Sequence, residues 1–167
     1  MLFRRNYLDL PFLPGVRRAE RRDLGAIVEL WLRLMQLHRE VDRRFELVAN
    51  ASQVMTQRFQ GLLNDPDALI LVSHEDGQIV GFLVGQIDVN LPFFPGATMG
   101  FVSDLYVVDG YRREGRGERM VEVLRSWFRM RGVSSIQLHA AACNPVAHEF
   151  WKKMGFEDYL MRMWSDV

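Results

Sequence analysis

The fold of this chain is decided by the stretch Tyr106-Val107-Val108-Asp109-Gly110-Tyr111-Arg112-Arg113-Glu114-Gly115-Arg116-Gly117. It starts in an apolar, β-rich run and leads into a segment whose apolar residues, from Met120 to Phe128, recur at helical spacing. A strand therefore feeds a helix through a glycine-spaced loop. Gly115 and Gly117 remove side chains where the first N–H groups of a helix lack partners, so an anion can approach those donors and the positive dipole end. Basic residues surround this point and two acidic ones offset half of their charge: Arg112, Arg113, Arg116 and Arg119, with Glu114 and Glu118. The stretch predicts a site for a phosphate-bearing cofactor.

The glycine spacing fits neither a Rossmann fingerprint nor a P-loop. The pattern Arg112-x-x-Gly115-x-Gly117 instead resembles the Arg/Gln-x-x-Gly-x-Gly/Ala signature of the GCN5-related N-acetyltransferases (GNAT). The alternative for this short pattern is a glycine-rich turn with solvated arginines.

Signals in the second half of the chain agree with this resemblance. Gly132 is a helix stop, residues 135–140 read as a strand, and Asn144-Pro145 is an N-cap followed by proline at the first helical position. A helical apolar stripe follows and ends at Gly155-Phe156. The order of these elements, from about residue 99 to 157, resembles the acetyltransferase core.

The chain reads as a short N-terminal arm, 1–13, followed by a single domain, 14–167. Asp23 is expected to cap a first helix, and a second helix ends at Asp65-Pro66. Two β-rich runs joined through Asp76-Gly77 predict a hairpin. We therefore expect an α/β (α+β) protein of the GNAT-type acyl-CoA N-acyltransferase fold, with a mixed, mostly antiparallel twisted sheet flanked by about four helices.

The composition limits the classes of partner. Twenty-one basic residues balance twenty-one acidic ones, so no overall field gathers nucleic acid or an anionic membrane. No apolar run approaches the ~20 residues of a membrane span. The lone Cys143 cannot form an internal disulfide, which predicts a cytoplasmic protein, and we expect its thiol to be a small buried filler rather than a nucleophile. No metal site is predicted, and a homodimer is left open.

The resemblance implies a site for acetyl-CoA. In the family the strand before the glycine loop is bulged and splays from its neighbour, and the cofactor arm hydrogen-bonds the exposed strand backbone. In this chain those groups belong to Leu105, Tyr106 and Val107. The pyrophosphate would take backbone N–H groups from the loop, with Arg112 as its lead residue: Arg113, Glu114, Gly115, Arg116, Gly117 and Glu118. Asn144 corresponds to an asparagine that contacts the arm, although capping the helix before Pro145 is an equal explanation.

Acetyl transfer to an amine requires removal of a proton, because an alkylamine with a pKa near 10.4 is mostly ammonium at neutral pH. Asp104 is our candidate for the general base; it precedes Tyr106 by two residues and therefore shares its strand face. The alternative roles of Asp104 are to anchor neighbouring backbone or to bind a cationic substrate. Three glutamates remain in reserve: Glu40, Glu46 and Glu75. The backbone N–H of Tyr106 or Val107 is the expected donor to the developing oxyanion.

One residue departs from the family pattern. Family members often carry tyrosine in the last helix, where it protonates the leaving thiolate, and this chain has Trp151. An indole N–H is not a practical proton donor, so core packing is the default interpretation of Trp151, and Tyr106 or Tyr159 would have to substitute. Because the general acid is missing, an alternative function remains: the protein could be an acyl-CoA-binding sensor or a partner-binding module with little turnover.

The acceptor pocket of the family is walled by segments that correspond to residues 31–50, 90–99 and 157–167. They mix aromatic and carboxylate side chains, which suits a small cationic amine. The leading hypothesis is an acetyl-CoA-dependent N-acetyltransferase that acts on a small-molecule primary amine. A protein or peptide N-acetyltransferase is the alternative within the family.

Overall fold

The computed structural model describes residues 10–93 and 96–167. Within them a five-stranded sheet has the order β1-β2-β3-β4-β5, with β4 and β5 parallel and the other neighbours antiparallel. The strands are β1 (Val16–Arg18), β2 (Ala68–Glu75), β3 (Gln78–Val89), β4 (Thr98–Val107) and β5 (Ile136–Leu138). The helices are α1 (Leu24–Val41), α2 (Ala51–Asn64), α3 (Arg116–Met130) and α4 (Pro145–Lys153), with short 3-10 turns η2 (Arg21–Asp23), η3 (Arg43–Phe45) and η4 (Asp109–Tyr111). The predicted α/β architecture is confirmed.

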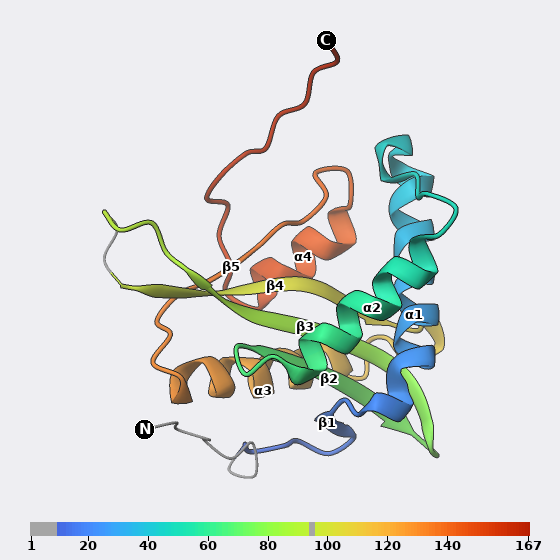
Figure 1. Ribbon diagram of the computed structural model, residues 1–167, viewed down its shortest axis with the longest axis vertical. Coiled ribbons are helices and arrows are strands. Elements are labelled where there is room, and N and C mark those ends of the chain that lie inside the picture. The colour runs from blue at the N-terminus through green and yellow to red at the C-terminus, as the bar shows by residue number, and fades with distance from the viewer. Residues whose placement is uncertain (1–9, 94–95) are drawn as a thin grey trace.

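Helices cover both faces of the sheet (Figure 1). Ile70 and Val72 of β2 pack with α1 and α2, whereas Leu69 and Leu71 of the same strand pack with α3. Successive side chains of a strand point to opposite faces, so a strand covered on both sides is apolar throughout. This explains why β2 reads as an unbroken hydrophobic run.

The β2–β3 connection is the predicted two-residue hairpin. Asp76 and Gly77 both have positive φ angles, 46° and 80°. A turn of type I′ requires positive φ at both central residues, and the Asp-Gly pair tolerates that conformation. The turn thereby sets the register that places Glu75 opposite Gln78.

The strand before the glycine loop carries the expected bulge. Val84 of β3 pairs with Asp104, but the next residue, Gly85, pairs with Val102, so Ser103 is an extra residue in β4. β5 pairs with residues 100–102 of β4, which lie before the bulge. In the described part of the chain, residues 103–107 have no partner in β5, and the sheet opens there.

Helix α3 lies so close to the sheet that two strand positions require glycine. A Cβ built on Gly85 would lie 2.4 Å from a methyl carbon of Leu124, and one on Gly100 would lie 2.7 Å from the ring of Phe128. Both α3 side chains are 1 % exposed and cannot move toward solvent. The glycines thus set the distance between α3 and the sheet.

Two local expectations were wrong: the cap expected from Asp23 and the length of the strand expected over 135–140. Asp23 does not cap α1 through its side chain, because its carboxylate accepts from the backbone N–H of Glu20 (2.8 Å) and from Arg17 (2.6 and 2.9 Å). Residues 1–9 of the predicted arm lie outside the described residues, but Leu10 is buried against the α3 side of the core. The strand expected over 135–140 is confined to β5.

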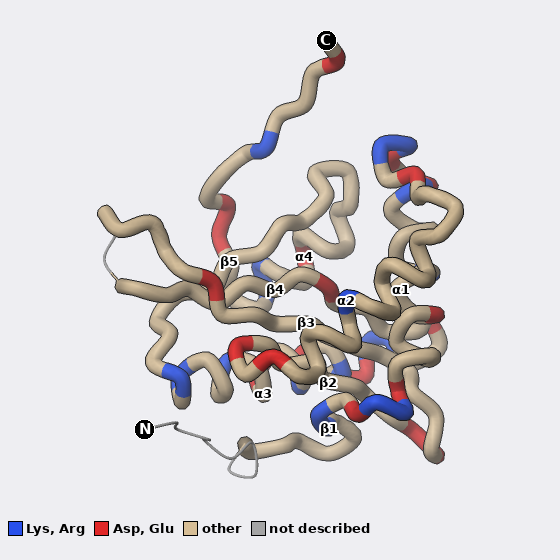
Figure 2. The backbone as a smooth tube through the Cα atoms, viewed as in Figure 1, with Lys and Arg blue, Asp and Glu red and all other residues tan. Residues whose placement is uncertain are grey.

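The charges follow the balanced composition. Figure 2 shows both signs of charge on α1 and on α3. Among the described residues, no helix is long and apolar enough to cross a bilayer. The expected exclusion of nucleic acid stays a prediction.

We predict that Gly85→Ala destabilises the fold by about 1–3 kcal/mol, because the added methyl overpacks against Leu124. Gly61→Ala is the matched control. Apart from its chain neighbours and the backbone of its own helix, no atom lies within 4 Å of its built Cβ, so alanine should stabilise α2 by about 0.5–1 kcal/mol. Urea denaturation of the three proteins measures both effects. A Gly85→Ala protein as stable as the wild type would contradict the close approach of α3.

Candidate active site

The start of α3 leaves several backbone N–H groups without partners in the helix. Gly115 is its N-cap with φ of 74°, a left-handed conformation that favours glycine, and no side chain caps the helix. The first-turn N–H groups of Arg116, Gly117 and Glu118 therefore lack intrahelical acceptors. Arg113 also has positive φ, 64°, so the loop alternates in handedness before the helix. Such alternation turns successive N–H groups toward one point, where an anion is favoured.

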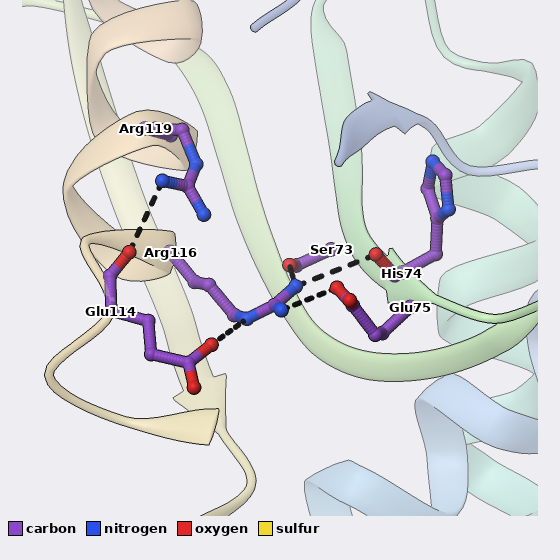
Figure 3. Close-up of polar contacts among 6 residues, drawn as sticks. All are labelled: Ser73, His74, Glu75, Glu114, Arg116 and Arg119. Atoms are coloured by element: carbon purple, nitrogen blue, oxygen red, sulfur yellow. Dashed lines mark hydrogen bonds and ion pairs between the residues drawn. The ribbon is translucent and has the colours of Figure 1, made fainter. Parts of the chain in front are cut away.

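The sequence places four arginines around this point, and three of them use their side chains in contacts within the protein. Arg112 donates from Nε to the carbonyl of Val107 (2.7 Å) and pairs with Asp109 (2.9 Å). Arg119 donates to the carbonyl of Glu114 (3.1 Å). Arg116 turns its guanidinium away, toward the end of β2 (Figure 3). The side chain of Arg116 is thus removed from the predicted cofactor contacts, while its backbone N–H remains at the helix start.

Gly117 has a packing role that the sequence did not indicate. A Cβ built there would lie 3.3 Å from the ring of Phe150 in α4, with Leu105 of β4 at 4.0 Å. The absent side chain thus lets α4 and β4 approach α3. Glu118, the next residue, pairs with Lys153 of α4 at 2.6 Å. The first turn of α3 is therefore fixed on its α4 side.

The backbone groups along the open part of β4 differ in direction. Val108 donates its N–H to the carbonyl of Val80, which lies just before Gly81 on β3. In an antiparallel pair the direction alternates by residue, so Tyr106 also bonds toward β3, whereas Leu105 and Val107 present their backbone groups to the opening. This corrects the expectation for Tyr106, whose N–H is not free to bind a cofactor arm or an oxyanion.

Asp104 lies on the α1 and α2 side of the sheet, where its strand-face neighbour Tyr106 is buried. Its carboxylate accepts from the hydroxyl of Ser103 (2.6 Å). Burial raises the pKa of Asp104, against the opposing influence of Ser103, Arg58, Trp31 and His38. Trp31 and His38 are seven residues apart on α1 and so share one helix face.

His38 is a second titratable group in this cluster. Burial lowers its pKa, although the charge of Asp104 acts in the opposite direction. Its ring stacks on Phe45 at 4.9 Å, and its Nδ1 is buried without a hydrogen-bond partner among the described residues. The seven-residue spacing of Trp31 and His38 on α1 could have indicated that they lie on one helix face. No local feature of the sequence indicated that Arg58 of α2 lies near them.

Two of the three reserve carboxylates, Glu75 and Glu40, have partners elsewhere in the structure. Glu75 pairs with Arg116, which lowers the pKa of Glu75, and it lies at the β2–β3 turn. Glu40 accepts from Gln36 (3.3 Å). Arg44 holds Asp42 and lowers the pKa of Asp42 to about 2. Glu75 is thereby excluded as a base for chemistry at β4, and fewer carboxylates are left for a cationic acceptor.

The last helix confirms the packing interpretation of Trp151. Its ring lies edge-on to Phe150 (5.0 Å) and to Phe156 (5.1 Å), in the cluster on the α3 face. Asn144 caps α4, because its Oδ1 accepts from the N–H of Ala147 (3.1 Å). A contact between Asn144 and a cofactor stays a prediction.

Two other expectations fail near the C-terminal end. Residues 157–167 form no strand, and Tyr159 and Trp164 are exposed on a segment that extends away from the body (Figure 1). This segment therefore does not wall a pocket in the structure. Cys143 is exposed rather than buried.

The comparisons with known proteins agree with this geometry. The family described as "Acetyltransferase (GNAT) family" matches residues 31–156. The uncharacterized N-acetyltransferase YhfO of Bacillus subtilis (strain 168) is 24% identical over 147 residues, which cover 86% of this chain and 90% of that protein. An aminoglycoside N(6')-acetyltransferase type 1 of Acinetobacter genomosp. 13 is 24% identical over 105 residues, covering 61% and 71%.

Two solved structures share the fold. A tetramutant of the BH1408 protein of Bacillus halodurans has a TM-score of 0.80 at 21% identity, covering 91% of this chain and 99% of that one. A predicted acetyltransferase of Clostridium acetobutylicum, solved with acetyl-CoA, has a TM-score of 0.71 at 21% identity, covering 91% of this chain and 94% of that one.

We predict that Asp104→Asn stabilises the folded protein at neutral pH. The unfolded chain releases this proton near pH 4, whereas the folded chain holds it to higher pH, so ionised Asp104 lowers stability once the pH exceeds both pKa values. The gain should disappear as the pH falls toward 4. Thermal unfolding of both proteins between pH 4 and 8 measures it, and a loss of stability at pH 7 would show that Asp104 stabilises the fold.

Proposed function

Because this chain belongs to the acetyltransferase (GNAT) family, we propose that it transfers the acetyl group of acetyl-CoA to a primary amine of a small molecule. One observation carries the proposal: the uncapped start of α3 stands beside the point where β4 separates from β5. Bare amides for an anion and unpaired strand backbone for an extended arm are thereby adjacent.

The residues present fit acetyl-CoA. Its phosphates would lie against the N–H groups of residues 113–118, and its arm would follow Leu105 and Val107. Arg112, which covers the carbonyl of Val107, would exchange that contact when the arm binds. When bound, acetyl-CoA supplies an activated thioester carbonyl. All other parts of the reaction belong to this chain and to the amine.

Asp104 is the proposed general base. A carboxylate with a raised pKa is better matched to proton removal near neutral pH than an ordinary aspartate. It stands two residues from Tyr106, after the bulge, on the face covered by α1 and α2. Trp31 hydrogen-bonds the carboxylate and the charge of His38 acts on it, both from α1, so the amine would approach from the opening of the sheet.

Val107 is the proposed oxyanion donor. Its N–H faces the opening and is fixed by the strand, so it need not reorient as negative charge develops on the carbonyl oxygen. Trp151 packs between two phenylalanines and supplies no proton to the departing thiolate. The pKa of the coenzyme A thiol should lie near the value of cysteine, about 8.5, so its thiolate can leave without protonation by an acid. Loss of acid catalysis slows the reaction by roughly 10²–10⁴-fold and does not abolish it.

A small amine is the favoured acceptor class. An aminoglycoside acetyltransferase is among the relatives, and aromatic side chains such as Trp31 and Phe45 lie near Asp104 and His38. The acyl-CoA-binding sensor remains the second candidate, because Trp151 replaces the expected acid.

The deciding experiment measures thiol release from acetyl-CoA over a panel of polyamines, aminoglycosides, amino acids and peptides. We expect saturable release with at least one small amine. Binding of acetyl-CoA without release for any member would favour the sensor, and release with peptides alone would favour a peptide acetyltransferase.

We predict that Asp104→Asn lowers turnover by roughly 10²–10⁴-fold, most strongly at the low end of the pH range in which Asp104 is still ionised, where the amine is least deprotonated. Glu122→Gln, which changes an exposed carboxylate of α3, is the matched control and should leave the pH–rate profile unchanged. An unaltered profile for Asp104→Asn would remove Asp104 as the base.

A further inference from the structure

Arg116 is a buried cation at the start of a helix. It is the first residue of α3, stands between the two glycines of the loop, and is 7 % exposed. The positive end of the helix dipole repels a cation at this position, and burial of an unpaired guanidinium is costly. A buried arginine here requires strong compensation, which must come from outside the helix.

That compensation joins the loop to the β2–β3 hairpin. The guanidinium pairs with Glu75 through Nη2 and with Glu114 through Nε (2.9 Å). Its Nη1 lies 3.4 Å from both the hydroxyl of Ser73 and the carbonyl of His74. Figure 3 shows the side chain reaching from α3 to the end of β2, with Glu114 on one side and Glu75 on the other.

The remaining contacts complete the enclosure. The ring of Tyr111 from η4 lies 5.3 Å from the guanidinium carbon, within cation–π range. The hairpin end is itself held, because His74 donates its N–H to the carbonyl of Gly15 (2.9 Å) beside β1. Two carboxylates neutralise the arginine, so its charge is not available to a phosphate. What it contributes is the position of the backbone on either side of it.

We propose that Arg116 is a positioning residue that locks the first turn of α3 to the β2–β3 hairpin and so holds the amides of residues 113–118 in the geometry that binds pyrophosphate. This inference rests on the proposed function. Arg116 acts through the backbone of the loop, and its side chain does not touch the ligand. Glu75, 41 residues earlier in the chain, is the second half of the lock.

The lock predicts a defined kinetic signature. Loosening the loop weakens acetyl-CoA binding but leaves the acceptor side near Asp104 unchanged. The KM for acetyl-CoA should therefore rise while kcat changes by less than about 2-fold. In the ligand-free protein, the amides of 113–118 should exchange with solvent faster.

The test compares Arg116→Met and Glu75→Gln with the wild type. Isothermal titration measures the acetyl-CoA Kd, and hydrogen exchange of the free proteins measures the loop. We expect a roughly 10-fold weaker Kd for Arg116→Met, a smaller loss for Glu75→Gln, and a double variant no weaker than Arg116→Met, because the two side chains act as one unit.

Arg17→Met is the matched control, because Arg17 lies on β1, the strand next to β2, and is also paired with a carboxylate, that of the buried Asp23. It should lower thermal stability but leave the acetyl-CoA Kd and the exchange of 113–118 unchanged. If Arg116→Met does not fold, Arg116→Lys and Glu75→Gln carry the same test, with faster exchange and weaker binding again expected.

The outcomes separate the two proposals. Wild-type affinity and wild-type exchange in the Arg116 and Glu75 variants would overturn the lock and leave the proposed function intact. An equal loss of affinity in Arg17→Met would also overturn it, because the effect would then follow stability. A wild-type protein that does not bind acetyl-CoA would overturn the proposed function and the inference together.

Discussion

The separation of β4 from β5 is the constraint on which the site depends. One extra residue, Ser103, bulges β4, and β5 pairs only with the part of the strand before it, within the described residues. Backbone N–H and C=O groups at Leu105 and Val107 then lack a strand partner, and buried groups of this kind must be satisfied by something else. Arg112 satisfies one of them at Val107. The opening therefore presents main-chain donors and acceptors, and it is created by a break in strand pairing rather than by particular side chains.

The sheet divides the proposed chemistry between its two faces. The α3 face holds the glycine loop, residues 113–118, with Gly117 packed against Phe150. The α1 and α2 face holds Asp104 near Trp31, His38 and Arg58. The bulge joins the two, since it lies immediately before Asp104 on the strand that leads to the loop. The proposed base on one face and the proposed phosphate donors at the end of the strand thus both adjoin the opening.

Most charges near the site are used in local pairs. Arg116 is enclosed by Glu75 and Glu114, and Asp42 by Arg44. In the proposed function, backbone amides at the helix start would recognise the acetyl donor, and Asp104 with the aromatic side chains around it would recognise the amine.

The sequence by itself determined the family resemblance, the strand–loop–helix unit, the Asp76-Gly77 hairpin and the helix stops at Gly132 and Gly155. Each of these features depends on the φ angles, spacing or capping of a few neighbouring residues. The positive φ angles of Gly132 and Gly155 agree with their expected role as helix stops. The tertiary structure alone decided that Arg116 faces Glu75 rather than the anion site, that Tyr106 bonds toward β3, and that Asp104 meets Arg58. These outcomes depend on which distant segments pack together. The spacing of residues around a side chain does not indicate a partner that lies far away in the sequence.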